Sequence, residues 1–171
     1  MAYRALDVAN YVVHRALETG QPITHLQLQK ILYYLEANSL VKNGEMLFED
    51  DIEKWRLGPV VPKVYHQYKI FGSEPISYIP EELVIDEESL NVFLKNFNPE
   101  SIKEQTKHII DPIIDKLLQY NGPFLVDQTH KHEIWLEDAD RINSGEKGIK
   151  YDKKQIKKYF EKHPQMLEIL K

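Results

Sequence analysis

Helical periodicity accounts for most of the chain. Apolar side chains recur three and four residues apart in five segments, the spacing that gives a helix one buried face: 4–19, 24–43, 62–71, 101–120 and 152–163. Glycine or proline separates these segments, and both residues favour helix ends over helix interiors. The pattern predicts a mainly α-helical protein, a single compact helical domain with minor short β-strands.

The connections carry weaker patterns. Residues 73–86 contain two prolines among apolar residues, which predicts a loop with one or two short strands. In residues 88–97, leucine and phenylalanine recur at helical spacing, and we predict a short helix there. Two further helices are expected at 124–130 and 134–142.

Pro112 lies inside a long helical segment and leaves two alternatives. It kinks one helix that continues to about Tyr120, or it occupies the first turn of a new helix capped by Asp111. In the first turn, the N–H that proline lacks would have no partner in any case. We favour the single kinked helix.

Length and composition fit one soluble globular domain. The chain has 171 residues, of which 42% are hydrophobic and 29% charged, and its mean hydropathy is −0.49. We predict a helical domain over residues 1–163 and a C-terminal extension over residues 164–171. The sequence has no long apolar run, no secretory signal and no cysteine, so it lacks disulfides and thiol chemistry. These features predict a cytoplasmic protein without a membrane partner.

The charge of the chain argues against broad nucleic-acid binding. The net charge is −5 and the isoelectric point about 5.8, whereas binding to phosphate backbones needs clustered lysine and arginine. Six lysines within residues 150–162 form a basic candidate, which we interpret as the solvated face of a helix. Four acidic residues within 49–53 lack the spacing and turn glycine of a calcium loop, and we expect a solvated acidic turn.

The most distinctive stretch runs from Trp55 to Tyr68. Gly58 precedes a proline, which disfavours helical backbone at that position, and Pro59 itself cannot donate a backbone hydrogen bond. Pro62 fits the first turn of a following helix that has an apolar and aromatic face. We predict a rigid corner, which serves either the packing of the core or the recognition of another polypeptide.

Three segments, in order along the chain, resemble one known family. The run W-x-x-G-P-V-V-P-x-V-Y at 55–65 resembles the central signature of the Panacea domain, which occurs in prophage-associated proteins and in antitoxins of toxin–antitoxin pairs. Upstream, L-Q-L-Q-K-I-L-Y-Y at 26–34 is similar to a helix of that family. Downstream, T-H-K-H-E-I-W at 129–135 is similar to its T-H-x-x-x-x-W element. The resemblance spans roughly residues 5–161.

The resemblance implies a protein-binding function. It indicates an antitoxin-like protein that binds and neutralises a cognate toxin protein by direct contact. An alternative is a proteolytic adaptor, which delivers a bound protein to a cytoplasmic protease. Residues 73–100 are longer than the family pattern, and we expect them to carry partner choice. The motif positions, which either hold the fold or contact the partner, are Leu28, Gln29, Lys30, Tyr33, Trp55, Gly58, Pro59, Val60, Pro62, Tyr65, Thr129, His130 and Trp135.

No recognisable catalytic run occurs in the sequence, and we expect no enzyme activity, no cofactor and no metal. The G-x-S-x-G, Walker A and dinucleotide-binding patterns are missing. The remaining enzyme alternative is a metal-dependent hydrolase around His130 and His132, which Glu133 follows. Histidines two positions apart do not share a helix face, so a metal would need a non-helical backbone and a distant third ligand. Structural roles, with His130 bonded to the backbone or to a tyrosine and Trp135 in the core, explain the run without a metal.

Overall fold

Helices make up most of the structure, a computed structural model that describes residues 2–171. The α-helices are α1 (Ala5–Glu18), α2 (His25–Lys42), α3 (Pro62–Tyr68), α4 (Glu104–Leu117), α5 (Gly122–Thr129), α6 (Glu133–Leu136), α7 (Ala139–Asn143) and α8 (Lys153–Lys162). The strands β1 (Glu53–Trp55) and β2 (Gly58–Val60) form one antiparallel pair, and β3 (Glu82–Ile85) and β4 (Val92–Lys95) form another. Short 3-10 helices are η1 (Lys69–Phe71), η2 (Pro99–Ser101) and η3 (Pro164–Leu170). The predicted mainly helical fold with minor β-structure is confirmed.

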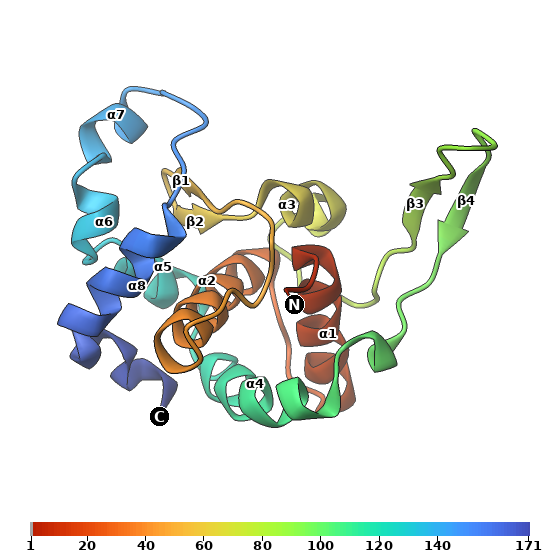
Figure 1. Cartoon of the computed structure of the whole chain (residues 1–171), viewed down its shortest axis with the longest axis horizontal. Helices are drawn as coiled ribbons and strands as arrows, with labels where there is room; N and C mark the ends of the chain where they lie inside the picture. Colours follow the sequence, from red (N-terminus) through yellow and green to blue (C-terminus); the bar gives the residue numbers. More distant parts are fainter. Residues whose placement is uncertain (1) are drawn as a thin grey trace.

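Helix α2 lies at the centre of the body and is surrounded by other elements (Figure 1). It packs against α1, α3, α4, α5, α8 and β2. Nearly every side chain from His25 to Leu40 is buried, so the polar groups of α2 must find partners inside the protein. Within the described residues, no helix, α2 included, has both the length and the apolar character needed to cross a membrane.

Specific caps begin the first two helices. Thr24 and Gln27 form a capping box at α2: the side chain of Thr24 accepts from the Gln27 amide, and the Thr24 amide donates to Gln27 Oε1 at 2.8 Å. At α1, the Ala5 amide donates to Asp50 Oδ2 at 2.7 Å, and Asp50 also pairs with Lys63 at 2.9 Å. The prediction of a solvated acidic turn is therefore wrong for Asp50, whose charge stabilises the N-terminus of α1.

Helix α4 continues through Pro112, as we predicted. Arg15 of α1 fixes its position, since the guanidinium donates to both carboxylate oxygens of Asp115 at 2.7 and 2.6 Å and to Asp111 at 3.0 Å. Asp111 thus pairs with a neighbouring helix and caps no new one, which decides between the two alternatives left by the sequence.

Two predicted helices are wrong in whole or in part. Residues 88–97 contain strand β4, which pairs along its length with β3. Leucine and phenylalanine there satisfy helical spacing, but cross-strand pairs satisfy the same residues equally well in so short a segment. Residues 134–142 form two helices, α6 and α7, with a break at Glu137 and Asp138. At this break Asp138 turns toward Lys54 Nζ, 2.6 Å away.

The C-terminal residues join the same body. Helix η3 packs against α4 and α8, and Leu167 is buried there. The partition at residues 163 and 164 stays a prediction, while the packing of η3 shows that these residues add apolar surface to the core.

Candidate functional site

The three motif segments meet at the β1–β2 hairpin. The two strands pair through Glu53↔Val60, Lys54↔Pro59 and Trp55↔Gly58, which leaves Arg56 and Leu57 at the tip. Side chains from α2, from His130 just after α5 and from α6 bind the backbone of this hairpin. We call this group of side chains and the hairpin that they hold the hairpin clamp.

Helix α2 supplies one side of the hairpin clamp. Lys30 is fully buried, and its Nζ donates to the Pro59 carbonyl at 3.0 Å. Gln29 accepts from the Val61 amide at 2.8 Å through Oε1, and its Nε2 lies 3.1 Å from His25 Nε2. Both contacts satisfy backbone groups just where β2 ends and α3 begins. The L-Q-K part of the motif therefore holds the corner.

The segment after α5 supplies the other side. Trp135 Nε1 donates to the Trp55 carbonyl at 3.0 Å, and His130 Nε2 lies 3.0 Å from the Arg56 carbonyl. The two rings stack, with centroids 4.0 Å apart and planes tilted by 25°. Successive carbonyls at the hairpin tip are thus bound by a stacked pair of side chains. The proposed structural role of His130, a bond to the backbone, is present.

Gly58 closes the hairpin against Thr129. Its φ of +92° lies in a region that residues with a side chain rarely adopt, and the position after the turn requires it. A Cβ built on Gly58 would lie 2.5 Å from Thr129 Oγ1 and 3.1 Å from Lys30 Cε. Thr129 is itself buried, with its hydroxyl donating to the Val126 carbonyl at 2.9 Å. Glycine at this position therefore permits the positive φ and avoids a clash between a Cβ and Thr129.

The remaining motif residues divide between core and surface. Leu28 and Val60 are in the core, and Pro62 begins α3 as predicted. Trp55 and Tyr65 are partly exposed and their rings contact each other, with centroids 4.8 Å apart. These two aromatics, with the exposed Arg56 and Leu57, form the outward side of the hairpin clamp. A partner-binding role for the motif residues stays a prediction, and these outward side chains are the ones able to serve it without rearrangement.

Burial changes the electrostatics of Lys30. Removal from water lowers the pKa of its ammonium group to about 7, because the charged form loses its hydration. The Pro59 carbonyl is its one hydrogen-bond acceptor within the described residues. At pH 7 about half of the Lys30 side chains are therefore uncharged, and the uncharged amine carries a smaller desolvation cost than the ammonium group.

His130 and His132 do not form a shared metal site. His132 is buried, its Nδ1 lies 3.0 Å from the Tyr33 hydroxyl, and aromatic rings of Tyr34 and Phe160 surround it. His130 instead faces the hairpin tip. Nowhere in residues 2–171 do three His, Cys, Asp or Glu side chains gather as metal ligands would. The arrangement of these two histidines in the described residues therefore offers no ligand set for the hydrolase alternative.

Acid should destabilise the protein through His132. Burial lowers the pKa of His132 to about 4, below its usual value near 6.5, so the unfolded chain binds a proton in this window that the folded chain does not. The contribution to stability is full above about pH 6.5 and is lost as the pH falls toward 4. His132→Asn keeps a polar group toward Tyr33 without the titration. In urea denaturation, the free energy of unfolding of wild type minus that of the variant should decrease by a few kcal/mol from pH 7.5 to 4.5. An unchanged difference would contradict this expectation.

Two buried lysines form ion pairs that no sequence pattern indicated. Lys54 is buried and pairs with Asp138 at 2.6 Å and Glu137 at 3.2 Å. Lys153 pairs with the fully buried Glu36 at 3.2 Å and donates to the Phe48 carbonyl, so the predicted solvated lysine face is wrong for Lys153. Each partner lies more than 80 positions away in the sequence, and no local pattern could have indicated these pairs.

A pocket of about 310 Å³ adjoins the hairpin clamp. Its lining comes from β1, the hairpin tip, α7 and the loop after α7, including Trp55, Ile142 and Lys147. Two carboxylates of the lining are engaged: Glu53 accepts from Trp55 Nε1 at 2.8 Å, and Glu146 pairs with Arg141 at 2.6 Å. The pocket offers apolar contact area and no activated nucleophile.

A helical domain whose motif side chains secure a hairpin is consistent with a binding scaffold, and comparison with known proteins identifies the family. Residues 28–136 match the family described as antitoxin SocA-like, Panacea domain, and this is more than half of the chain. The chain belongs to this family, as the three segments indicated.

A curated relative is antitoxin SocA of Caulobacter vibrioides (strain NA1000 / CB15N). The two sequences are 38% identical over 72 residues, which is 42% of this chain and 38% of that protein. The match thus spans well under half the length of the curated relative. No solved structure matches the chain.

Proposed function

We propose that this chain is an antitoxin-like protein that binds a cognate toxin protein by direct contact and holds it inactive. The observation that carries the proposal is membership of the antitoxin SocA-like family over residues 28–136. The partial similarity to antitoxin SocA agrees with it. The proposed mode of action is steric: a rigid helical scaffold covers the toxin's active surface in the cytoplasm.

The hairpin clamp suits such a scaffold. Its motif side chains form hydrogen bonds with backbone carbonyls of the hairpin, so the tip with Arg56 and Leu57 has a fixed position. A surface ordered before binding loses little conformational entropy when a partner covers it. Trp55 and Tyr65 beside the tip are residue types that contribute strongly at protein interfaces.

Co-expression with the product of the neighbouring gene tests the proposal. That product should arrest growth when expressed alone, and this chain should restore growth and co-purify with the product. An empty vector and an unrelated helical protein serve as controls. If the neighbouring product is harmless alone and does not co-purify with this chain, the proposal fails.

The lifetime of the bound product separates an inhibitor from a proteolytic adaptor. We expect a pulse–chase experiment to show a partner that lasts at least as long in the presence of this chain as in its absence. A partner that disappears faster, and only when a cytoplasmic protease is active, would instead assign the adaptor role. Both outcomes are measured on the same co-expression strain.

A further inference from the structure

The β3–β4 hairpin projects from the helical body (Figure 1). Its strands pair in register from Glu82↔Lys95 to Ile85↔Val92, with Leu83 opposite Leu94 between them. Because side chains alternate along a strand, Leu83, Ile85, Val92 and Leu94 share one face. We call these four side chains the aliphatic face.

Every member of the aliphatic face is exposed. The exposed fractions are 63% for Leu83, 57% for Ile85, 57% for Val92 and 58% for Leu94. Leu90 in the connecting turn is 77% exposed, at a positive φ of 56°. Exposed apolar patches of a few hundred Å² on otherwise well-packed proteins commonly mark interaction sites.

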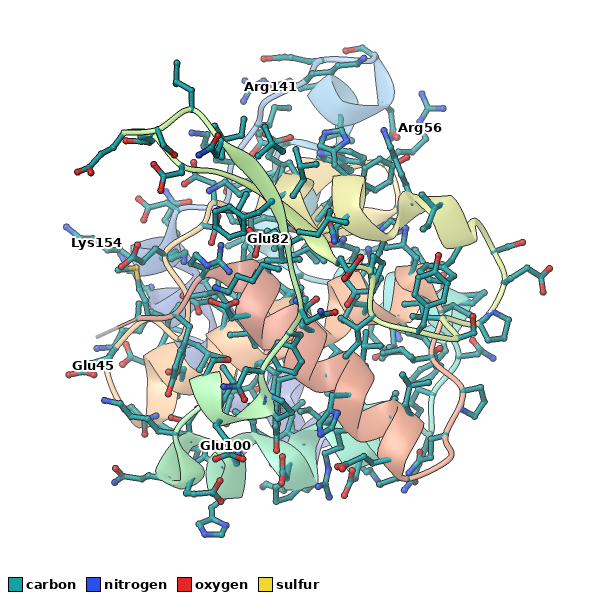
Figure 2. The ribbon with its side chains drawn as sticks, turned by 90° about the vertical axis from the view of Figure 1, so that its right-hand side faces the viewer. Glu45, Arg56, Glu82, Glu100, Arg141 and Lys154 are labelled. Carbon is teal, nitrogen blue, oxygen red and sulfur yellow. The ribbon has the colours of Figure 1, made fainter. Side chains whose placement is uncertain are left out.

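Side-chain hydrogen bonds anchor the root of the hairpin to the body, beginning at Glu82, which is labelled in Figure 2. Arg4 donates to both carboxylate oxygens of Glu82 at 2.7 and 2.9 Å and also binds Asp7. Gln67 Nε2 donates to the carbonyls of Pro80 and Glu81 at 3.2 and 3.1 Å. The hairpin is thus presented in one direction, while its aliphatic face lacks a covering element in the described chain.

Such a hairpin needs a covering partner. Two strands alone are marginally stable in water, and sheet edges usually carry charges that discourage contact. The four paired strand positions of the aliphatic face are all leucine, isoleucine or valine, so no charged side chain interrupts this face within the two strands. An uninterrupted apolar face on an anchored arm is therefore suited to burial against another molecule.

Charge indicates which kind of molecule covers it. Residues 81–95 contain Glu81, Glu82, Asp86, Glu87 and Glu88 against a single base, Lys95. Glu82 is held by Arg4, and the other carboxylates are exposed near the tip and root. A second copy of this chain, with a net charge of −5, would meet the arm with like charge. A partner surface rimmed by lysine and arginine complements it.

We infer that the β3–β4 hairpin is the docking arm of this protein, and that its aliphatic face enters an apolar groove on the toxin whose basic rim meets the acidic tip. The inference rests on the proposed antitoxin function and names the element that contacts the toxin. The β1–β2 hairpin clamp then stabilises the body from which the arm extends.

Two matched double variants test the aliphatic face with purified full-length protein and the neighbouring gene's product. Leu83→Thr with Leu94→Thr changes one cross-strand pair, and threonine keeps the strand preference. Ile70→Thr with Ile109→Thr is the control, because both residues are exposed aliphatics on the body, outside the hairpin. By calorimetry, the arm variant should bind at least about tenfold more weakly, and the control within about twofold of wild type.

The tip is tested by Glu87→Gln with Glu88→Gln. This variant should slow association and weaken the dependence of the association rate on salt, because two charges that attract the basic rim are gone. Hydrogen exchange of the wild-type complex should show new protection of amides within 82–95. Asp86 is left unchanged, since it accepts from the amides of Glu88 and Ser89 and shapes the turn.

Each other outcome overturns the inference in a recognisable way. If the arm variants bind like wild type and hydrogen exchange at 82–95 does not change on binding, the inference of a docking arm is wrong while the antitoxin function stands. If wild type neither binds nor neutralises the neighbouring product, the antitoxin function fails and the docking arm with it. If wild type alone sediments as a dimer and the Leu83/Leu94 variant as a monomer, a second copy covers the aliphatic face.

Discussion

Replacing Gly58 by alanine is expected to lower the free energy of unfolding by about 2–5 kcal/mol. The backbone term comes from a φ of +92°, where an L side chain is strained. The packing term comes from the 2.5 Å separation between the new Cβ and Thr129 Oγ1, which is too short for two unbonded heavy atoms. Thr129 is buried, so it cannot swing away into solvent. Urea denaturation monitored by circular dichroism measures the change.

Two controls separate the terms at Gly58. Gly148→Ala also faces a positive φ, of 76°, but no heavy atom lies within 4 Å of its Cβ, so only the backbone cost of about 1–2 kcal/mol is expected. Adding Thr129→Ala to Gly58→Ala removes the clashing hydroxyl. The double variant should therefore lose less free energy of unfolding than the sum of the losses in the two single variants. Strict additivity of the two substitutions would contradict the packing argument.

The stability difference between wild type and Lys30→Met should grow with pH. Burial lowers the pKa of Lys30 to about 7 from its usual 10.5, so between these values the unfolded chain binds a proton that the folded chain does not. The free energy of unfolding of wild type therefore gains roughly 1.4 kcal/mol per pH unit from this group across that window. Methionine does not titrate and has a similar length, so the variant lacks this gain.

Denaturation at pH 7, 8 and 9 measures the difference. We expect it to rise by about 2–3 kcal/mol over this range in favour of wild type. Lys131→Met is the control, because Lys131 is exposed and hydrated in both states, and its difference from wild type should stay constant. A flat difference for Lys30→Met would mean that the amine keeps its charge inside the protein.

Local patterns in the sequence were sufficient for the long helices. The helix predicted at 24–43 begins at the Thr24–Gln27 capping box and ends just before Gly44, which has a positive φ, and the next helix begins at Pro62 as predicted. Each of these helix ends is set by residues close together in the sequence. The same holds for α4, where the helical stripe on both sides of Pro112 outweighed the helix-breaking effect of the proline.

Contacts between segments that are distant in the sequence could not be predicted from local sequence patterns. Strand β4 was predicted as a helix because its spacing fits both states, and only pairing with β3 selects the strand. For the hairpin clamp, the sequence named the motif positions but not their common target. Lys30 reaches a carbonyl 29 residues away and Trp135 one 80 residues away, and no spacing rule connects such groups.

The enclosure of α2 has a consequence for biosynthesis. Its wrapping comes from α1 and α3 near the start of the chain and from α5 and α8 near the end. Until the second half of the chain has been synthesised, the apolar surface of α2 stays exposed to solvent. A nascent or truncated chain is therefore incompletely folded and susceptible to proteolysis. A gene cut short by a nonsense mutation before α8 should therefore yield no folded protein, rather than a less stable one.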